Sequence, residues 1–388
     1  MRIRSRRLLI TFFALALGPA LILLSALYAY DPLMLFHTPW GRSMTVHHNM
    51  RLQAAGVIRH GDFDSVLLGT SLFENTSADE AGRLLGGRFV NISLTAGDFF
   101  ERSLVLGDLL KRRKVAEVIY SLDFIYLNQR IGFRLFPLPT FDFLYDDNPL
   151  NDIRVYLNQH FLTCLVGWSN APECVGRPVS LDRPNAWKDD PEHAARFGGF
   201  DHWCKAADLP QMRDVQDKAA TAARAIAEGE VERLTASEQQ ARTARAIAYV
   251  EEHVLRHVRA HPETRFHLVL PPYSRGKFAL WYQDKRGDAE AHQAVVRTLV
   301  AASARWPNLV VYGWEDQDLL DDLARYKDLD HFDAGVNSLI LEAIRARQHV
   351  LTPENLEAYL HEARRRAQAY DLADLAARLH ACQTGHTP

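Results

Sequence analysis

The chain has 388 residues, 47% of them hydrophobic, and a formal net charge of −3. This apolar content is enough to bury a sizeable core, which argues against an intrinsically disordered chain. Acidic and basic residues are mixed along the sequence without a basic stripe. Neutralising the phosphates of a nucleic acid needs such a stripe, so we expect no nucleic-acid partner.

The chain begins with an arginine-rich tip and an uncharged apolar run from Leu8 to Tyr30. This run is long enough to cross a hydrocarbon layer of about 30 Å as a helix. The arginines before it and Asp31 after it predict a cytoplasmic amino terminus and a main domain on the periplasmic side of a bacterial inner membrane. The alternative, a cleaved signal peptide, usually has a shorter apolar region of about 7 to 15 residues. We therefore favour a retained single-pass anchor over a cleaved segment.

Composition and periodicity divide the chain into four parts. Residues 1–30 form the tip and anchor, 31–54 a juxtamembrane linker or helix, 55–350 an α/β domain, and 351–388 a helical tail. The α/β domain carries an insertion at about 128–262. The stretch "NMRLQAAGVIRHG" has helical spacing and is predicted to end at Gly61.

Short β-rich apolar runs alternate with helical stretches in the α/β domain. The expected strands are Val66–Gly69, Phe89–Ser93, Val118–Leu122, Phe266–Leu270 and Leu309–Tyr312. Strands that are apolar throughout and alternate with helices indicate a mainly parallel sheet covered on both faces. The expected fold is a three-layer α/β/α sandwich of flavodoxin-like type, with ligands at the carboxyl ends of the strands. A Ser77-x-x-Glu80 capping box is expected to start one of its helices.

The insertion has two parts of different composition. The first is rich in aromatic residues, Pro and Asn and is predicted to be irregular, and the second is rich in Ala, Arg and Glu and helical. The helical part is expected to pack through one face, made of Ala244, Ile247, Val250, Val254 and Val258.

The four cysteines suit disulfides in an exported domain. Cys164 and Cys174 are the expected pair, because they are close in sequence, and Cys204 with Cys382 would tie the insertion to the tail. The alternative is that all four are reduced and buried. No Cys-x-x-Cys or His-Glu-x-x-His motif occurs, so we expect neither a metal nor another cofactor.

A serine and a distant Asp–His pair are the candidate catalytic residues. Ser71 ends a Gly-Thr-Ser turn after the first expected strand, and "YKDLDHF" supplies Asp328 and His331 after the last. A serine hydroxyl becomes nucleophilic when a histidine accepts its proton and a carboxylate orients that histidine. Asp328, three residues before His331, is placed to reach Nδ1 while Nε2 faces Ser71. Each motif alone is weak, and their shared position at one sheet edge makes the pair more specific.

These motifs resemble the SGNH, or GDSL-like, hydrolase superfamily from about Val57 to Val350. The resemblance implies Ser71 as nucleophile, His331 as base and Asp328 as orienting carboxylate. It also implies backbone N–H groups, those of Ser71 and of Gly97 in "VNISLTAGD", as oxyanion donors. Gly-Thr-Ser-x-x-Glu-Asn, "LPPYS" and "YKDLDHF" are also similar to membrane-anchored SGNH-like proteins of bacterial surface-polysaccharide systems. That similarity implies acyl-ester chemistry on a cell-envelope glycan.

One position departs from the family pattern. "VIYSLDFIYLN" places Asp123 where the superfamily has an asparagine that donates to the oxyanion. A carboxylate there would repel a developing oxyanion, and losing one such donor costs about 3 to 4 kcal/mol of transition-state stabilisation. Three alternatives stay open: Asp123 is protonated, Asp123 points away to bind substrate hydroxyls, or another amide such as Asn75 substitutes.

Further residues are candidates for substrate contact. Glu74 lies in the loop after Ser71, and a set of residues follows the fourth expected strand: Tyr273, Ser274, Trp281 and Tyr282. Aromatic faces there would stack on pyranose rings. The alternative for each is ordinary loop chemistry or core packing.

Two functions therefore compete. The first is a membrane-tethered serine esterase or O-acyltransferase that acts on a cell-envelope polysaccharide, with a membrane acyl-donor protein as partner if it transfers. The second is a catalytically altered SGNH-like protein that binds glycan or scaffolds a polysaccharide assembly or export system, an alternative that Asp123 favours. A metal-dependent hydrolase would need clustered carboxylates and histidines beyond the Asp328–Asp333 loop, and the sequence offers no such set.

Overall fold

A single parallel sheet forms the framework of the part of the chain that carries the candidate catalytic residues. The computed structural model describes residues 2–128 and 141–384. Its strands are β1 (Ser65–Leu68), β2 (Phe89–Asn91), β3 (Glu117–Ser121), β4 (Arg265–Val269) and β5 (Leu309–Tyr312). They lie in the order β2-β1-β3-β4-β5, and every neighbouring pair is parallel. Each strand overlaps its predicted run, so the α/β class is confirmed.

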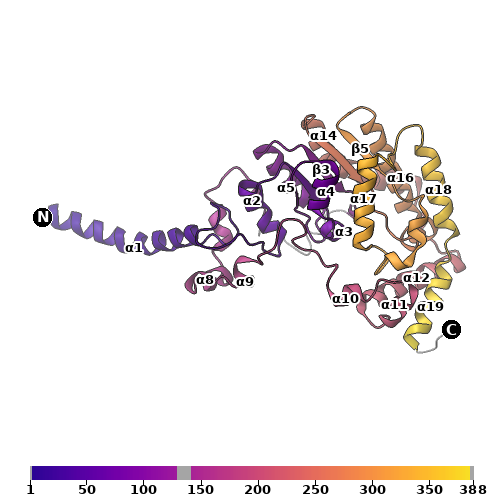
Figure 1. Cartoon of the computed structure of the whole chain (residues 1–388), viewed down its shortest axis with the longest axis horizontal. Coiled ribbons are helices and arrows are strands. Elements are labelled where there is room, and N and C mark those ends of the chain that lie inside the picture. The colour runs from indigo at the N-terminus through magenta and orange to yellow at the C-terminus, as the bar shows by residue number, and fades with distance from the viewer. Residues whose placement is uncertain (1, 129–140, 385–388) are drawn as a thin grey trace. The chain divides into compact units, whose positions relative to one another are not determined.

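Helices precede, connect and follow these strands (Figure 1). The α-helices are α1 (Arg2–Tyr30), α2 (Met50–His60), α3 (Ser71–Glu74), α4 (Ala78–Leu85), α5 (Phe99–Arg112), α6 (Ile125–Asn128), α8 (Gln159–Val166), α9 (Pro172–Val175), α10 (Pro191–Ala194), α11 (Phe200–Lys205), α12 (Pro210–Glu228), α13 (Ala236–Val250), α14 (Arg256–Ala260), α15 (Arg275–Ala279), α16 (Arg286–Ser303), α17 (Ala334–Ala346), α18 (Leu356–Ala369) and α19 (Leu372–Thr384). Short 3₁₀ segments are η2 (Asp142–Tyr145), η3 (Asp152–Tyr156), η6 (Asp318–Asp321) and η7 (Leu323–Arg325). Single π-helical turns, η4 (Glu251–Leu255) and η5 (Leu280–Asp284), follow α13 and α15.

The chain divides into two compact units. Unit 1 combines Met1–Asp62 with Phe136–Ser180, and unit 2 combines Phe63–Leu135 with Leu181–Pro388. The expected insertion is therefore split: residues 136–180 of its irregular part group with the amino-terminal segment, whereas the rest of that part from Leu181 and the helical part group with the sheet. The tail belongs to unit 2.

Helix α1 is the one helix of the described chain that is long and apolar enough to cross a membrane. The candidate span is Thr11–Tyr30, with a mean hydropathy of 2.1 and only 6% of it buried. A buried core helix would also be apolar, so the exposure of α1 is what separates it from one. The predicted N-terminal apolar helix is confirmed to this extent.

The strand order creates a switch point between β1 and β3. The chain passes from β1 outward to β2 and then returns to β3 on the other side of β1. In open α/β sheets of this kind, the connections on the two sides of the switch point leave a crevice at the carboxyl ends of the strands. Thr70 and Ser71 follow β1 and Asp123 follows β3 at this edge.

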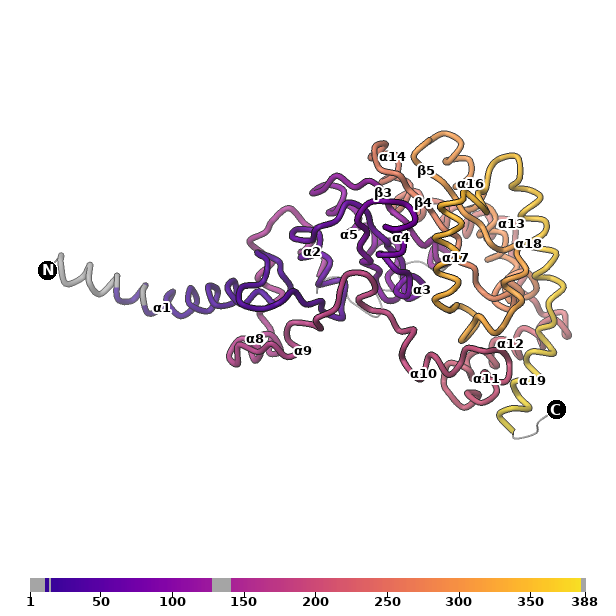
Figure 2. The backbone as a smooth tube through the Cα atoms, viewed as in Figure 1, coloured from indigo at the N-terminus to yellow at the C-terminus, as the bar shows by residue number. Residues whose placement is uncertain are grey.

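Segments distant in sequence hold the carboxyl-terminal part of unit 2 together. Helices α12 and α19 lie side by side (Figure 2), and a disulfide joins Cys204 beside them to Cys382. Residues Val250, Val254 and Val258 of the expected packing face are buried, but Ala244 is exposed. The prediction for Ala244 was wrong because residues three positions apart on a helix of 3.6 residues per turn are rotated by about 60° from one another. Two such steps, from Val250 back to Ala244, turn the side chain away from the packing face.

Candidate active site

The turn between β1 and α3 delivers Ser71. A side chain at Gly69 would place its Cβ 2.7 Å from the Cβ of Phe73 and 2.9 Å from that of Ser121, so only glycine fits this close approach. Thr70 is the N-cap of α3, and its hydroxyl accepts a hydrogen bond from the Leu72 N–H. Ser71 is therefore the first helical residue, at the mouth of the strand–helix turn.

The loop before α17 delivers the candidate base. Asp328 Oδ1 accepts backbone N–H bonds from Asp330 and His331, at 2.9 and 2.8 Å. These bonds close the loop around its own carboxylate, as an Asx turn does. Asp333 then caps α17, accepting from the Val336 N–H.

Ser71, His331 and Asp328 meet although Ser71 and His331 are 260 positions apart. Ser71 Oγ lies 2.9 Å from His331 Nε2, and His331 Nδ1 lies 3.0 Å from both Asp328 oxygens. Burial alone would raise the pKa of Asp328, but the charge and hydrogen bond of His331 and the nearby Lys327 bring that pKa below its usual value. An ionised Asp328 holds His331 with Nε2 free to accept the Ser71 proton.

Helix α17 is fastened to the segment that carries Ser71. Buried Asn337 donates from Nδ2 to the Leu72 carbonyl (2.9 Å) and the Thr76 hydroxyl (2.8 Å). Ser338 donates to a Glu80 carboxylate oxygen. The expected capping box is thus only half formed: Ser77 caps the Glu80 N–H, whereas the Glu80 carboxylate accepts from α17. These bonds set the position of His331 relative to Ser71.

Asp123 belongs to a buried ion pair beneath the serine. Its Oδ2 lies 3.0 Å from an Arg102 guanidinium nitrogen, and its Oδ1 accepts from the Thr70 and Ser121 hydroxyls. Burial raises the pKa of Asp123, and the Arg102 charge opposes that rise. Both Asp123 oxygens are therefore engaged within the protein and support the Thr70–Ser71 turn, and Asp123 also lines the cavity beside Ser71.

Of the two other expected oxyanion donors, Gly97 is engaged elsewhere, whereas the Asn75 Nδ2 group has no acceptor among the described residues. The Gly97 N–H donates to the Leu94 carbonyl at 2.7 Å. The buried Asn75 carbonyl oxygen accepts from the Trp187 and Lys188 N–H groups. Ala96, in a left-handed turn at φ 51°, lines the cavity beside Ser71 in place of Gly97. Within the described chain the N–H groups of Ser71 and Ala96 have no acceptor and both residues line the cavity, so these two N–H groups are the oxyanion candidates there. Asn75 Nδ2 is also without an acceptor, but Asn75 is not among the residues that line this cavity.

Two cavities flank His331. The smaller, about 160 Å³, contacts both Ser71 and His331. Its accessible surface is mainly apolar, from Leu72, Phe124 and Ile125 among others, and its polar lining residues are Thr70, Asp123, Tyr273 and Asp330. The larger, about 390 Å³, extends from Asp328 and His331 to α12 and Lys277. Asp330, paired with Lys277 at 2.8 Å, borders both. The arrangement offers an apolar space next to the nucleophile and a polar one beyond the base.

No model of a known protein family matches this chain, and no curated protein or solved structure does either. SGNH membership therefore stays a prediction from the motifs. Function has to be inferred from the geometry of Ser71, His331 and Asp328.

Most of the expected sugar-contact residues are not at an exposed rim. Trp281 is buried among Phe124, Phe278 and His292. Ser274 is also buried and donates to the Leu329 carbonyl, which ties the start of α15 to the Asp328 loop. Those two predictions are corrected. Tyr273 lines the smaller cavity, and the Glu74 carboxylate accepts from Thr95 beneath the turn.

A tryptophan from the insertion reaches the triad, which the sequence did not indicate. Trp187 donates from Nε1 to the Ser71 carbonyl at 2.8 Å, and its ring meets His331 edge to face at 5.7 Å. The Lys327 ammonium lies 3.7 Å from the centre of the same ring. The Lys327 ammonium also lies 3.1 Å from His193 Nδ1. Burial and the positive charge of Lys327 both lower the pKa of His193. Trp187 thus links nucleophile, base and loop.

The effect of Trp187 on Ser71 can be measured with Trp187→Phe. Phenylalanine keeps a ring beside His331 but loses the bond to the Ser71 carbonyl, which contributes about 1 kcal/mol. We expect Ser71 to react with a fluorophosphonate roughly fivefold more slowly. The matched control is Trp203→Phe, which loses a comparable 2.8 Å bond to the Tyr326 carbonyl. Equal labelling rates in wild type and Trp187→Phe would show that the Trp187 hydrogen bond does not affect the reactivity of Ser71.

Lys327 should make stability depend on pH. Burial, with a contribution from Arg196, lowers the pKa of Lys327 to about 8, and the charge of Asp328 opposes it. Because the unfolded chain keeps the ordinary higher value, it binds more protons between these two pKa values, so stability rises as pH increases. Relative to Lys327→Met, the wild type should gain about 2 to 3 kcal/mol of unfolding free energy from pH 7 to pH 10. An equal difference between the urea midpoints of wild type and Lys327→Met at the two pH values would contradict this.

Neither a metal site nor a second complete triad is found in the described residues. No group of three or more His, Cys, Asp or Glu side chains there is arranged to hold a metal ion. A second Ser–His pair does occur, Ser103 Oγ to His257 Nε2 at 2.8 Å. Burial and Arg256 lower the pKa of His257 to about 4, and Arg256 rather than a carboxylate is its neighbour. This pair is a structural counterpart that lacks the orienting Asp.

Proposed function

We propose that the chain is a membrane-tethered serine esterase or O-acyltransferase of SGNH-like fold, built as a three-layer sandwich and facing the periplasm. The observation that carries the proposal is the chain of contacts from Ser71 to His331 to Asp328 beside a cavity. The strand order 2-1-3-4-5, typical of flavodoxin-like doubly wound sheets, and the position of Ser71 at the switch point support it.

In the proposed mechanism Ser71 attacks an ester carbonyl while His331 takes its proton. The Ser71 and Ala96 N–H groups stabilise the oxyanion, and His331 then protonates the leaving alcohol. Water or a second hydroxyl resolves the acyl-enzyme, so hydrolysis and transfer share the first half of the reaction. Asp123 supports the Thr70 turn through its bond to the Thr70 hydroxyl, and its pairing with Arg102 offsets its negative charge at the cavity.

The two cavities suggest which part of an ester substrate, the acyl group or the alcohol, occupies each of them. The smaller, largely apolar cavity suits a short acyl group such as acetyl, and its volume of about 160 Å³ leaves little room for a long chain. The larger cavity offers Gln211, Asp214, Lys218 and Lys277 to an alcohol rich in hydroxyls. We therefore propose a cell-envelope polysaccharide as the alcohol, with a membrane acyl donor as partner if the enzyme transfers.

The test is covalent labelling of the purified full chain with a fluorophosphonate, followed by peptide mass spectrometry. Phosphonylation of Ser71 would support acyl chemistry. Absence of labelling together with saturable binding of a surface glycan would instead favour the alternative, an inactive glycan-binding or scaffold protein of an assembly or export system.

A further inference from the structure

An exposed part of unit 1 has the composition of a membrane-contacting segment. No Asp, Glu, Lys or Arg occurs between Arg154 and Glu173, a stretch that covers the end of η3, all of α8 and the turn that follows. Three large apolar side chains in this stretch are nevertheless exposed: Leu157 by 47%, Val166 by 90% and Trp168 by 53%. Outside unit 1, the one large hydrophobic residue of the described chain that is exposed is Ile226, at 38%.

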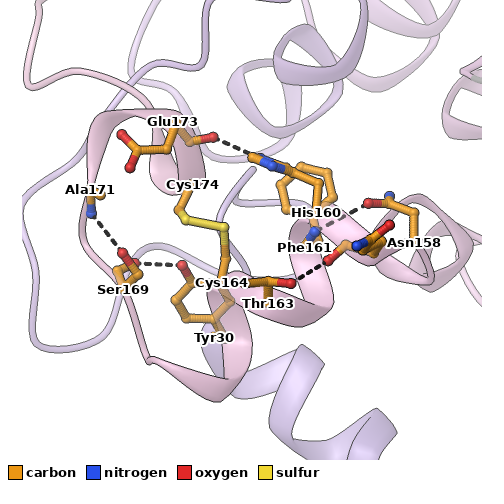
Figure 3. Close-up of a disulfide and its surroundings, with 11 residues drawn as sticks. Tyr30, Asn158, His160, Phe161, Thr163, Cys164, Ser169, Ala171, Glu173 and Cys174 are labelled. Carbon is orange, nitrogen blue, oxygen red and sulfur yellow. Dashed lines mark hydrogen bonds between the residues drawn. A yellow bond between two sulfur atoms is a disulfide. The ribbon is translucent and has the colours of Figure 1, made fainter.

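This segment is fastened to the end of the candidate membrane span. The Tyr30 hydroxyl donates to the Ser169 carbonyl, and the Cys164–Cys174 disulfide closes the turn that carries this carbonyl (Figure 3). The rings of Tyr30 and Trp168 are 5.4 Å apart. Tyr30 is the last residue of α1, so the exposed segment is held at the level where α1 ends.

A second exposed tryptophan lies at the same end of α1. Trp40 is 59% exposed and stacks on His37 at 3.9 Å. Its ring is 6.2 Å from that of Tyr28, within the last turn of α1. Tryptophan favours the boundary between headgroups and acyl chains, because its ring is apolar and its N–H can stay hydrated.

We infer that Trp40, Leu157, Val166 and Trp168, here termed the aromatic collar, rest in the interface of the same bilayer that α1 crosses. The occupant of this surface is thus lipid, at the side of the membrane where α1 ends. The inference rests on α1 spanning the membrane, which is part of the proposed function. Trp168 adopts a left-handed conformation at φ 43°, which a bulky side chain rarely does. The free-energy cost of this backbone conformation is offset when the Trp168 indole moves from water into the lipid interface.

The test uses the full chain in nanodiscs with one nitroxide label at a time. Because all four native cysteines are in disulfides, Val166→Cys, Leu21→Cys and Ile226→Cys can be labelled selectively. Leu21 reports on the α1 span, and Ile226 is the matched exposed apolar control. We expect the labels at 21 and 166 to collide more often with oxygen than with an aqueous nickel chelate, and the label at 226 to show the reverse ratio.

The outcomes separate the two proposals. If the label at 166 behaves like that at 226 while that at 21 is in lipid, the collar is overturned and the anchor stands. If the label at 21 is also aqueous, the anchor fails and the collar with it. All three sites are exposed, and circular dichroism matching the wild type verifies that each variant is folded.

Discussion

Replacing Ser71 with alanine should abolish turnover of a chromogenic acetate ester, with kcat falling on the order of 10⁴ to 10⁶-fold. Ser71 Oγ is the only atom of the site that forms the acyl bond in the proposed mechanism. Its removal leaves His331 and Asp328 in place, but they then have only water to activate. Stability should change little, because the Ser71 side chain is partly exposed and its Thr70 cap remains.

The matched control is Ser103→Ala. Ser103 makes a serine–histidine contact of nearly the same length, 2.8 Å against 2.9 Å, but without a carboxylate on the histidine. Turnover should therefore survive in Ser103→Ala. If Ser71→Ala keeps the wild-type rate, the esterase proposal fails whatever the family resemblance.

Replacing Asp123 with asparagine should cost about 3 to 5 kcal/mol of unfolding free energy, the usual penalty for leaving one partner of a buried ion pair without its counter-charge. The Arg102 guanidinium is fully buried, over the rings of Phe99 and Tyr120, and donates to the Ser121 carbonyl. An amide at position 123 removes its counter-charge. The Thr70 hydroxyl also loses a charged acceptor, so the reactivity of Ser71 should fall as well.

A double-mutant cycle in urea isolates this pair. Arg102→Leu with Asp123→Asn should recover part of the stability lost in Asp123→Asn alone, because no charge is then buried. Glu357→Gln is the surface control: it breaks an exposed pair with Arg297, and its curve should overlay the wild type. A negligible loss in Asp123→Asn would mean that Asp123 is neutral in the fold.

The sheet and the triad were predictable for the same reason. Continuous apolar runs mark buried strands, and the carboxyl ends of parallel strands meet at one edge, so motifs that follow the first and last strands converge. Ser71 and His331 follow from that rule. Their hydrogen-bonding distance does not, because it depends on bonds such as that of Asn337 to Leu72, which join segments far apart in sequence.

What could not be predicted involves side chains that contradict their local pattern. Arg102 lies on a helix whose charges otherwise suggest a solvated face, yet it is buried under the site. Trp187 comes from an irregular insertion, where spacing carries no information about position. The candidate oxyanion donor after β2 differs from the expected one by one residue, because the Gly97 N–H closes the turn and Ala96 lines the cavity.

The Cys204–Cys382 bond encloses a loop whose ends are 178 positions apart, and that loop includes Asp328 and His331 but not Ser71. A protease that cuts once inside it produces two pieces that still migrate as one molecule until a reductant is added. Fragment maps of this protein should therefore be recorded with and without dithiothreitol, since a nicked chain would otherwise pass for an intact one.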